Sequence, residues 1–414
     1  MIFIKITKLS ARQVLDSRGN PTVEVTAFSG NISESAMVPS GASTGKYEAV
    51  ELRDDSIEFF GKGVKKAVFN IKKIERRIKG MDVRYQEKID GAMLELDGTK
   101  NKSKLGANAI LGVSMACARL SARLQSKPLY KVIAKLAKTP KVCMPVPFAN
   151  VINGGKHAGN ELQMQEFMIV PVKARDFEHA TRVVSETYHV LKGIIEKKYG
   201  KSATGVGDEG GFAPPVKTAS EALSLIVRAI RKSGYEDILS IAMDPAASEF
   251  YQDGRYRIER NLTSKGMASY YEKLVEKYPI ISIEDPFDQD DLQTFTDFTE
   301  KLSKTLQIVG DDLLVSNPKR IELALKNNLC NALLLKVNQI GTVTEAIKAA
   351  RMAFDNNWNV MVSHRSGETE DTFIADLAVG LGCGQIKLGS PCRGERTAKY
   401  NRLLYLEGKL PFGK

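Results

Sequence analysis

The chain has 414 residues, 43% of them apolar and 26% charged, so it can bury a sizeable core, and either two domains or one barrel with an appended domain is expected. The first 20 residues carry too short an apolar run for a signal peptide, and no stretch approaches the roughly 20 apolar residues that cross a bilayer. A cytoplasmic protein without a membrane span is expected. Five scattered cysteines without a C-x-x-C pair argue against a disulfide framework and a zinc site.

The formal net charge of +11 raises the question of a polyanionic partner. Much of this charge lies in residues 62–80, where apolar side chains recur at helical spacing and lysine and arginine fill the opposite face. The pattern predicts a packed helix over residues 62–79 with a solvated basic face. A polyanion-binding patch is the weaker hypothesis, because aromatic residues are not expected among the charges, and nucleic acid is therefore disfavoured as a partner.

The first part of the chain mixes strand and helix patterns. Residues 21–30 and 34–41 are typical of antiparallel strands, and residues 62–79 and 105–125 of helices. The proline-bearing stretch 139–148 then interrupts any helix. We therefore expect an N-terminal α+β domain over residues 1–138 and a second domain over residues 139–414.

From residue 221 onward, helical patterns alternate with short apolar runs. Expected helices cover 221–234, 270–278, 292–305, 318–328, a segment opened by the capping box Thr342-x-x-Glu345, and 373–382; the apolar runs lie in 239–244, 279–285, 306–312, 331–339, 359–368 and 385–389. Strands that alternate with helices form a parallel sheet. One or two further strands from residues 142–172 bring the count near eight, which predicts an α/β fold with a (β/α)8-type barrel.

Each of the six apolar runs ends in polar or charged residues. These are, in chain order, Asp244, Glu284, Asp311, Lys336, the run His364-Arg365-Ser366, and Lys387. A single charge after a strand is usually the start of a solvated loop, but the C-terminal strand ends of a barrel meet at one mouth, where active sites lie. Three carboxylates there would repel one another without a cation, and all-oxygen ligation favours Mg²⁺, with Mn²⁺ second.

The cationic strand ends face these acids. Arg365 beside Ser366 is suited to a bidentate grip on phosphate or carboxylate, with Lys336, His364 and Lys387 nearby. The expected substrate is a small polyanion held between metal and cations.

Three loops add candidate residues. The segment 40–46, SGASTGK, fails the P-loop pattern and fits a lid that offers a hydroxyl to a metal, or an ordinary turn. The segment 205–211, GVGDEGG, matches a dinucleotide fingerprint only superficially, because Pro214 and Pro215 obstruct the helix that should follow. Residues 152–168 carry His157, which alone would more often be structural, and Glu166. Glu166 and Glu209 in one mouth would be a carboxyl pair in which burial and like charge raise at least one pKa.

Together these groups suggest removal of a proton next to a carboxylate, followed by loss of a leaving group. Lys336, with its pKa lowered by neighbouring cations, is a candidate base, and His364 is a rival that spacing cannot separate from it.

The motifs DSRGNPTVEV, VPSGASTG, NVINGGKHAGN, QEFMI, GDEGGFAP, SIEDPF, GDDL, LLLKVNQIGT, SHRSGETED and RGERTAKYN, in this order, resemble the enolase family over essentially the whole chain. The resemblance implies an α+β cap before a modified barrel and the reversible dehydration of 2-phosphoglycerate to phosphoenolpyruvate in glycolysis and gluconeogenesis. It implies two Mg²⁺ ions per site, the second arriving with substrate, and a homodimer or an assembly of dimers. It also implies a cytoplasmic protein with a minor cell-surface or secreted pool.

The resemblance also implies individual roles. Lys336 takes the C2 proton, and Glu209, helped by Glu166, protonates the departing hydroxyl. The metal ligands are Asp244, Glu284 and Asp311, with Ser43 for the second ion, and the substrate-binding residues are His157, Gln165, Glu166, Glu284, Asp311, Lys336, Ser363, His364, Arg365, Ser366 and Lys387. Pro245 and Leu388 depart from the family pattern beside site residues. The alternatives are another proton-abstracting enzyme of the same superfamily, which the cationic clamp disfavours, and a secondary surface or polyanion-binding role.

Overall fold

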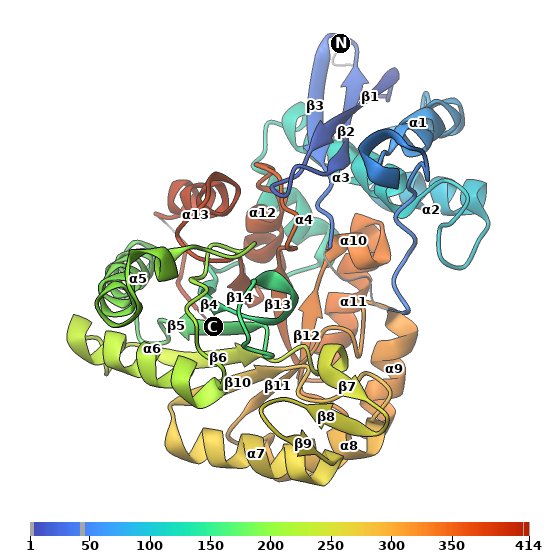
Figure 1. Cartoon of the computed structure of the whole chain (residues 1–414). Coiled ribbons are helices and arrows are strands. Elements are labelled where there is room, and N and C mark those ends of the chain that lie inside the picture. The colour runs from blue at the N-terminus through green and yellow to red at the C-terminus, as the bar shows by residue number, and fades with distance from the viewer. Residues whose placement is uncertain (1–3, 42–45, 409, 414) are drawn as a thin grey trace.

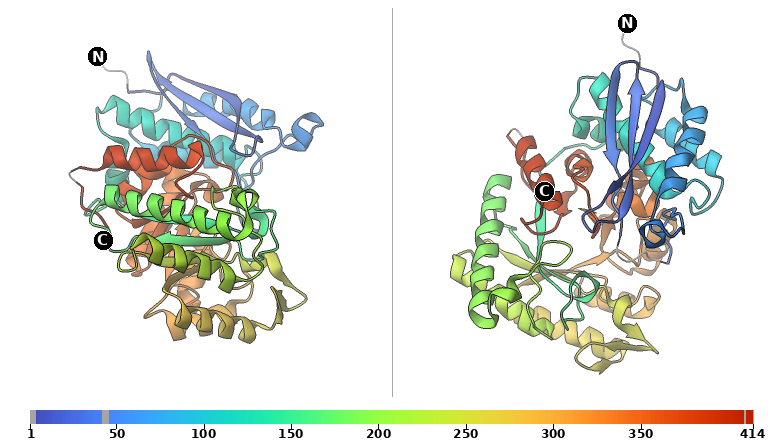
Figure 2. Two further views of the ribbon diagram at one scale, coloured as in Figure 1. Left: turned by 60° about the vertical axis from the view of Figure 1, so that its left-hand side comes forward. Right: turned by 45° about the horizontal axis from the view of Figure 1, so that its top comes forward.

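The computed structural model describes residues 4–41, 46–408 and 410–413 (Figure 1). A three-stranded antiparallel sheet opens the chain, with strands β1 (Lys8–Leu15), β2 (Pro21–Ser29) and β3 (Ile32–Met37) in the order β1-β2-β3. Four helices follow: α1 (Lys65–Ile78), α2 (Gln86–Asp97), α3 (Ala107–Leu124) and α4 (Leu129–Ala137), with a 3-10 turn at Glu58–Gly61. The sheet stands at one end of the molecule (Figure 2).

Helix α3 is the central element of this N-terminal part. Nearly every one of its side chains is buried, because it contacts β2 and β3 on one side and α1, α2 and α4 around it, and it reaches the barrel helices α10 (Val337–Ile340) and α11 (Val343–Asp355). Its small residues, such as Gly112 and Ala116, let these neighbours approach closely. A Cβ on Gly112 would lie 2.6 Å from a methyl of Val25.

Helix α1 confirms the predicted amphipathic helix. Ala67, Ile71, Ile74 and Ile78 are buried, and the lysines and arginines lie on the outer face. The expectation that no aromatic ring lies among the charges is wrong. Phe69 is 60% exposed, and the ammonium groups of two neighbouring lysines lie near its ring.

A closed barrel of eight strands forms the second part, in the order β10-β11-β12-β13-β14-β4-β5-β6. The strands are β4 (Val146–Asn153), β5 (Glu166–Val170), β6 (Ser240–Asp244), β10 (Ile280–Glu284), β11 (Gln307–Gly310), β12 (Ala332–Leu335), β13 (Asn359–Ser363) and β14 (Gly384–Lys387). Side chains such as Phe148, Met168 and Leu334 form a separate apolar cluster. Their positions alternate with outward-facing residues, so the cluster fills the barrel interior.

Strand β5 is the exception in an otherwise parallel barrel. It pairs antiparallel with both β4 and β6. Its first residue, Glu166, therefore lies beside Asn153 and Asp244, the last residues of the neighbouring strands. The predicted barrel of modified topology is confirmed, and the reversed strand brings its N-terminal residue to the mouth.

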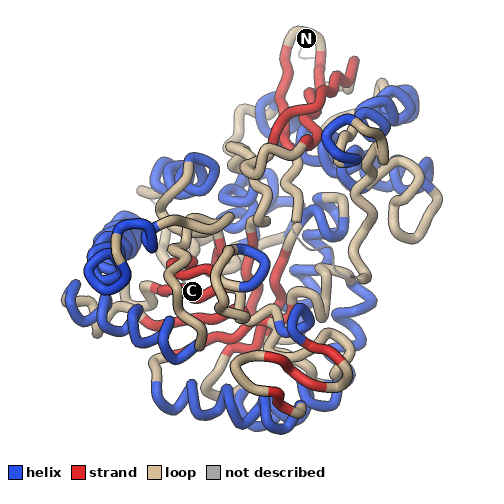
Figure 3. Tube along the Cα trace, in the orientation of Figure 1, coloured by secondary structure: helices blue, strands red, loops and turns tan. Residues whose placement is uncertain are grey.

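The barrel is enclosed by helices, with the strands forming a ring at the centre (Figure 3). They are α5 (Phe177–Tyr199), α6 (Ala219–Ser233), α7 (Ser264–Lys277), α8 (Leu292–Leu302), α9 (Pro318–Asn327), α11, α12 (Phe373–Leu381) and α13 (Gly394–Leu406). A small antiparallel sheet, β7 (Tyr251–Gln252), β8 (Arg255–Arg257) and β9 (Asn261–Leu262), follows the 3-10 turn Ala247–Phe250. The remaining 3-10 turns are Gly155–His157 and Lys201–Thr204.

Helix α11 is capped from both parts of the chain. The Thr342 hydroxyl accepts a hydrogen bond from the backbone N–H of Glu345 at 3.1 Å. The Glu345 carboxylate accepts from the Thr342 hydroxyl at 2.7 Å and pairs with Lys102, so it is not bound to the Thr342 N–H as a capping box requires. The reciprocal box forms at Thr218 and Glu221, at the start of α6.

Two residues of the N-terminal part supply the remaining caps of α11. The Ser114 hydroxyl accepts from the Val343 N–H at 3.0 Å, and the Asp90 carboxylate accepts from the Thr344 N–H at 3.0 Å. The first N–H groups of a helix have no partner within it, so side chains of α2 and α3 complete a barrel helix. The expected domain division at residues 138 and 139 falls between α4 and β4 and stays a prediction. No helix within the described residues is long and apolar enough to span a bilayer.

Candidate active site

The strand ends meet at a small cavity of about 30 Å³ in the barrel mouth. It is lined by His157, Gln165, Glu166, Glu209, Ala246, Asp285, Asp311, Asp312, Lys336, Ser363, His364, Arg365, Ser366 and Lys387. Most of the predicted site residues are in this lining, and all of these are mostly or fully buried. Ser43 lies outside the residues that the structure describes, so its predicted role stays a prediction.

Lys387 joins the acidic strand ends. Its ammonium group, at the end of β14, lies 2.9 Å from the Asp244 carboxylate, 3.0 Å from both oxygens of Glu284 and 3.0 Å from Glu166. All four side chains are buried, so an unpaired charge among them would be strongly destabilising. The carboxylates that lie on β6, β10 and β5 therefore converge on one point.

Lys336 pairs with the third acid. Its ammonium group contacts Asp311, whose other oxygen accepts a hydrogen bond from the Gln339 side chain at 2.8 Å. The expectation that neighbouring cations lower the pKa of Lys336 is wrong for this arrangement. Burial acts to lower it, as does the charge of Arg365, but the negative charges of Asp311 and Glu284 together outweigh them, and the pKa of Lys336 is raised.

Glu166 and Glu209 lie on either side of His157. The His157 Nδ1 atom is 3.6 Å from Glu166 and 3.5 Å from Glu209, and all three side chains are buried. Burial, and then the negative charge of Glu209, raise the pKa of Glu166 well above its ordinary value. Burial also acts to raise the pKa of Glu209, but His364 and His157 beside it hold it below its usual range. The two carboxyl groups thus prefer opposite protonation states, as an acid pair requires.

His364 belongs to the same group. Its Nε2 atom lies 3.3 Å from Glu209, and its Nδ1 atom lies 2.6 Å from the guanidinium of Arg396. Burial, together with the positive charge of Arg396, outweighs the negative charge of Glu209 and lowers the pKa of His364 to about 3. His364 is neutral at physiological pH.

Arg365, which was expected to bind a phosphate or carboxylate of the substrate, binds the carboxylate of Glu48 in this structure. Both terminal nitrogens of Arg365 lie 3.2 Å from Glu48, in the segment before α1, and Arg365 also donates to Asn338 at 3.0 Å. The fork is therefore held in the planar, bidentate geometry that an anion requires. The Ser366 hydroxyl lies within 3.5 Å of the Arg18 guanidinium, so the N-terminal part contributes to this side of the mouth.

Several site residues were not predicted from the sequence. Asp285 accepts the backbone N–H groups of Asp311 and Asp312 at 3.0 and 2.6 Å, and so holds the turn after β11. Asp285 directly follows the predicted ligand Glu284, and no further sequence pattern marks its role. Glu48 and Arg396 lie far from the strand ends in sequence, and no local pattern marks their contacts.

A divalent cation fits the donor chemistry of the mouth. Asp244, Glu284 and Asp311 offer only carboxylate oxygens. Burial, together with the negative charges of Asp244 and Asp311, raises the pKa of Glu284 well above its ordinary value, although Lys387 acts to lower it. Within the described residues, two groups each bring their potential ligand atoms within 4.8 Å of one another, and neither is the predicted set of three: His157, Glu166 and Glu209, and Asp285, Asp311 and Asp312. Acidic side chains are therefore gathered at this mouth well beyond what the lysines alone can neutralise.

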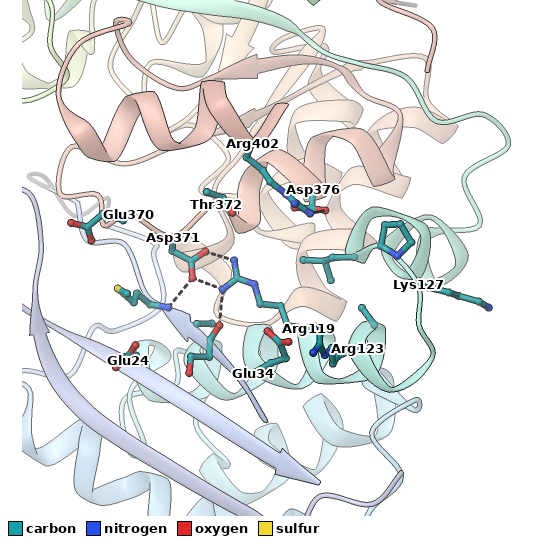
Figure 4. A pocket seen from close by; sticks show the side chains of 16 residues that line it. Glu24, Glu34, Arg119, Arg123, Lys127, Glu370, Asp371, Thr372, Asp376 and Arg402 are labelled. Atoms are coloured by element: carbon teal, nitrogen blue, oxygen red, sulfur yellow. Dashed lines mark hydrogen bonds and ion pairs between the residues drawn. The ribbon is translucent and has the colours of Figure 1, made fainter. Parts of the chain in front are cut away.

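A larger hollow of about 560 Å³ lies away from the mouth, between the N-terminal sheet and the segment before α12 (Figure 4). Arg119 of α3 forks onto Asp371 at 2.6 and 2.7 Å and donates to the Ser35 carbonyl at 2.7 Å. Arg402 pairs with Asp376 in the same way. These charges are neutralised locally, so this hollow has the character of a structural interface.

The fold and the site define a barrel enzyme that carries a buried lysine base candidate, a carboxyl pair and an acidic cluster suited to a divalent ion at one mouth. The model of the "Enolase, N-terminal domain" matches residues 6–133, and that of the "Enolase, C-terminal TIM barrel domain" matches residues 141–412. An enolase of Methanocaldococcus jannaschii is 56% identical over 413 residues, which cover 99% of this chain and 96% of that protein. The chain belongs to the enolase family of hydro-lyases.

Proposed function

We propose that this chain catalyses the reversible dehydration of 2-phosphoglycerate to phosphoenolpyruvate, with Lys336 as the base and Glu209 as the acid. The observation that supports it is the meeting of a buried lysine, a buried carboxyl pair and an arginine fork in one cavity of the barrel mouth. The family acts on a phosphorylated carboxylate through a divalent metal, and the donor set at the mouth suits these groups.

Lys336 takes the proton from C2. It directly follows β12, its side chain is 13% exposed, and it can act as a base only when its contact with Asp311 is weakened. The raised pKa of Lys336 therefore belongs to the ion pair that it forms with Asp311 in this arrangement. A cation held by Asp311 would neutralise the partner that favours the charged amine, and the adjacent Arg365 and Lys387 would then lower the pKa of Lys336.

Glu209 gives a proton to the departing hydroxyl, and Glu166 supports it. The raised pKa of Glu166 favours a stored proton, and His157 lies between the two carboxyl groups. Gln165, Ser363, His364, Arg365, Ser366 and Lys387 are proposed to hold the substrate with these residues. Arg365 would exchange the Glu48 carboxylate for the anionic end of the substrate, because both are planar bidentate partners.

Asp244, Glu284 and Asp311 would hold one Mg²⁺ ion and Ser43 a second that arrives with substrate. Bound ions supply positive charge beside the substrate carboxylate and so stabilise the enolate. Lys387, now bound to Asp244 and Glu284, would turn its ammonium group to the substrate.

The test is the ultraviolet absorbance of the enol phosphate formed from 2-phosphoglycerate, measured with Mg²⁺ and again with excess chelator. Turnover that needs the metal is the expected result. If the protein with Mg²⁺ forms no enol phosphate, the proposed reaction is wrong.

We also propose a homodimer or an assembly of dimers, which light scattering of the purified protein checks directly. A monomer at all concentrations would contradict it.

A further inference from the structure

Arg396, on α13, is buried with 0% exposure at the back of the mouth. One terminal nitrogen, Nη1, lies 2.6 Å from His364 Nδ1 and 2.6 Å from the Arg365 carbonyl. The other, Nη2, donates to the carbonyls of Asp208 at 2.9 Å and Ser366 at 2.7 Å. One guanidinium thus ties the loop that carries Glu209 to the segment that follows β13.

The packing leaves Arg396 little freedom to move. Gly389 has a φ of +85°, and a Cβ there would lie 2.8 Å from both Arg396 Cδ and the Glu209 carbonyl. A side chain at position 389 would therefore displace both groups. The contact between Arg396 and His364 is built into the fold by a glycine that makes room for it.

The chemistry of the guanidinium decides the tautomer of His364. Arginine is always protonated and has only donors, so His364 Nδ1 must accept. A neutral imidazole that accepts at Nδ1 carries its hydrogen on Nε2. That atom lies 3.3 Å from Glu209 Oε2, so the Nε2–H of His364 faces the carboxylate.

The two oxygens of Glu209 then differ. Oε2 faces His364 and also accepts from the Asn150 side chain at 3.0 Å. Oε1 lies 3.5 Å from His157, on the side of Glu166. Because Oε2 faces these two donor groups, Oε1 is the oxygen that is free to take up a proton from the side of Glu166.

We propose that Arg396 is a positioning residue that fixes His364 as the neutral Nε2–H tautomer, so that His364 presents a donor to Glu209 Oε2 and leaves Oε1, on the side of Glu166, as the oxygen that takes up the acid proton during the reaction. A second proton on His364 Nδ1 would face the guanidinium across 2.6 Å. His364 is thereby excluded as the base, which leaves Lys336. The assignment of Glu209 as the acid rests on the proposed function, whereas the tautomer does not.

The first test observes the tautomer in the unaltered protein. The chain has four histidines, so ¹⁵N-histidine labelling gives few ring signals, and His364→Asn identifies those of His364. Between about pH 6 and pH 9, the expected spectrum shows an unprotonated Nδ1 and a protonated Nε2. A protonated Nδ1, in a neutral ring or an imidazolium, overturns the proposal. The experiment needs no substrate, so it stands even if turnover of 2-phosphoglycerate is not found.

The second test removes the guanidinium. Arg396→Gln should lower kcat about 100-fold, less than the roughly 10⁴-fold loss seen where a misplaced tautomer affects a histidine that itself carries the proton. It should also add an ionisation near the ordinary histidine value of about 6.5 to the pH profile, and KM should change less than kcat. Arg396→Lys keeps one donor and should restore part of the rate and the original pH profile.

Arg402→Gln is the matched control, because Arg402 lies on the same helix and pairs with Asp376 away from the mouth. It should leave the pH profile and the His364 signals unchanged. If Arg396→Gln lowers kcat but leaves the His364 signals and the pH profile as in the unaltered protein, Arg396 has only a structural role and the proposal is wrong. If that variant does not fold, the spectrum of the unaltered protein still decides the tautomer.

Discussion

The barrel mouth and the contact between the N-terminal helices and α11 both bury polar or acidic side chains, but the groups that donate hydrogen bonds to them differ. At the α11 contact, carboxylate and hydroxyl oxygens of Asp90 and Ser114 accept backbone N–H groups. At the mouth, carboxylates accept from the ammonium groups of Lys336 and Lys387. A backbone donor is fixed by its helix, whereas a lysine ammonium can rotate away. The first arrangement is permanent, and the second can be exchanged for metal and substrate.

The largest expected effect on activity follows from removing Lys336, the proposed base. Lys336→Ala should lower turnover of 2-phosphoglycerate by about 10⁴-fold, the upper range for loss of a general base. Exchange of the C2 proton with solvent, followed by NMR in D₂O, should also stop, because no other base would remain. Retained exchange would return the base role to His364 and contradict the tautomer proposed above.

The control for that change is Lys326→Ala, on the outer helix α9. Surface substitutions away from special features change stability by less than about 0.5 kcal/mol. Exchange and turnover in this variant should therefore match the unaltered protein.

At the interface between the two parts of the chain, Arg119→Ala should lower stability without stopping the reaction. It leaves Asp371 buried without its partner, and breaking a buried pair typically lowers the free energy of unfolding by about 3–5 kcal/mol. Denaturant unfolding measures this loss, and turnover per folded molecule at low temperature should persist. A variant as stable as the original would show that water replaces the guanidinium there.

The contribution of Asp90 to the stability of the α11 contact should depend on pH. Burial raises the pKa of Asp90 to about 6, despite hydrogen bonds from Thr344, Ser114 and Gln86. An acid whose folded pKa is raised contributes most stability below its unfolded pKa and loses it as the pH rises through the folded value. Between about pH 4.5 and pH 8, the advantage of the unaltered protein over Asp90→Asn should fall by about 2 kcal/mol.

Unfolding of both proteins as a function of pH tests this expectation. A difference that grows with pH would show that the carboxylate at the start of α11 is ionised and stabilising.

The smallest effect is expected on the basic face of α1. Lys72→Glu with Lys73→Glu should change the free energy of unfolding by less than about 0.5 kcal/mol per site and leave turnover unchanged, because these side chains lie on the solvent side. Binding of a labelled oligonucleotide at low salt provides the second measurement. Binding that this variant loses would favour the polyanion hypothesis, and the exposed Phe69 beside these lysines makes the test worthwhile.

The parallel part of the barrel was predictable because each of its strands is a short apolar run followed by an amphipathic helix. The alternation of apolar runs with helical patterns, and the residues that begin the helices, were enough to place β6 and β10 through β14. The reversal of β5 was not predicted, since the family resemblance implied only a modified barrel, although a physical signal exists. Parallel neighbours need a crossover of about a dozen residues, usually a helix, and residues 154–165 contain only a 3-10 turn.

The site was predictable to the extent that its residues sit at strand ends. Asp244, Glu284 and Asp311 lie where the alternating pattern places them, at one end of one barrel. Their partners were not predictable. The contacts of Lys387 with Asp244 and Glu284, and of Arg396 with His364, depend on how side chains pack in the mouth. Neither the distance along the sequence nor the residue type predicts this packing.

The reversal of β5 has a further consequence for how loops reach the mouth. A strand that starts at the mouth ends at the opposite face, where β6 begins, so any helix that leaves this face must be followed by a second one that returns to it. The chain does so with two packed antiparallel helices, α5 and α6, instead of one. The segment that joins them, residues 200–218, therefore turns at the mouth and delivers Glu209 without occupying a strand end. Because β5 is reversed, two helices instead of one connect it to β6, and the loop between them is an additional loop at the mouth. This loop can vary in length and sequence while every barrel strand keeps its register.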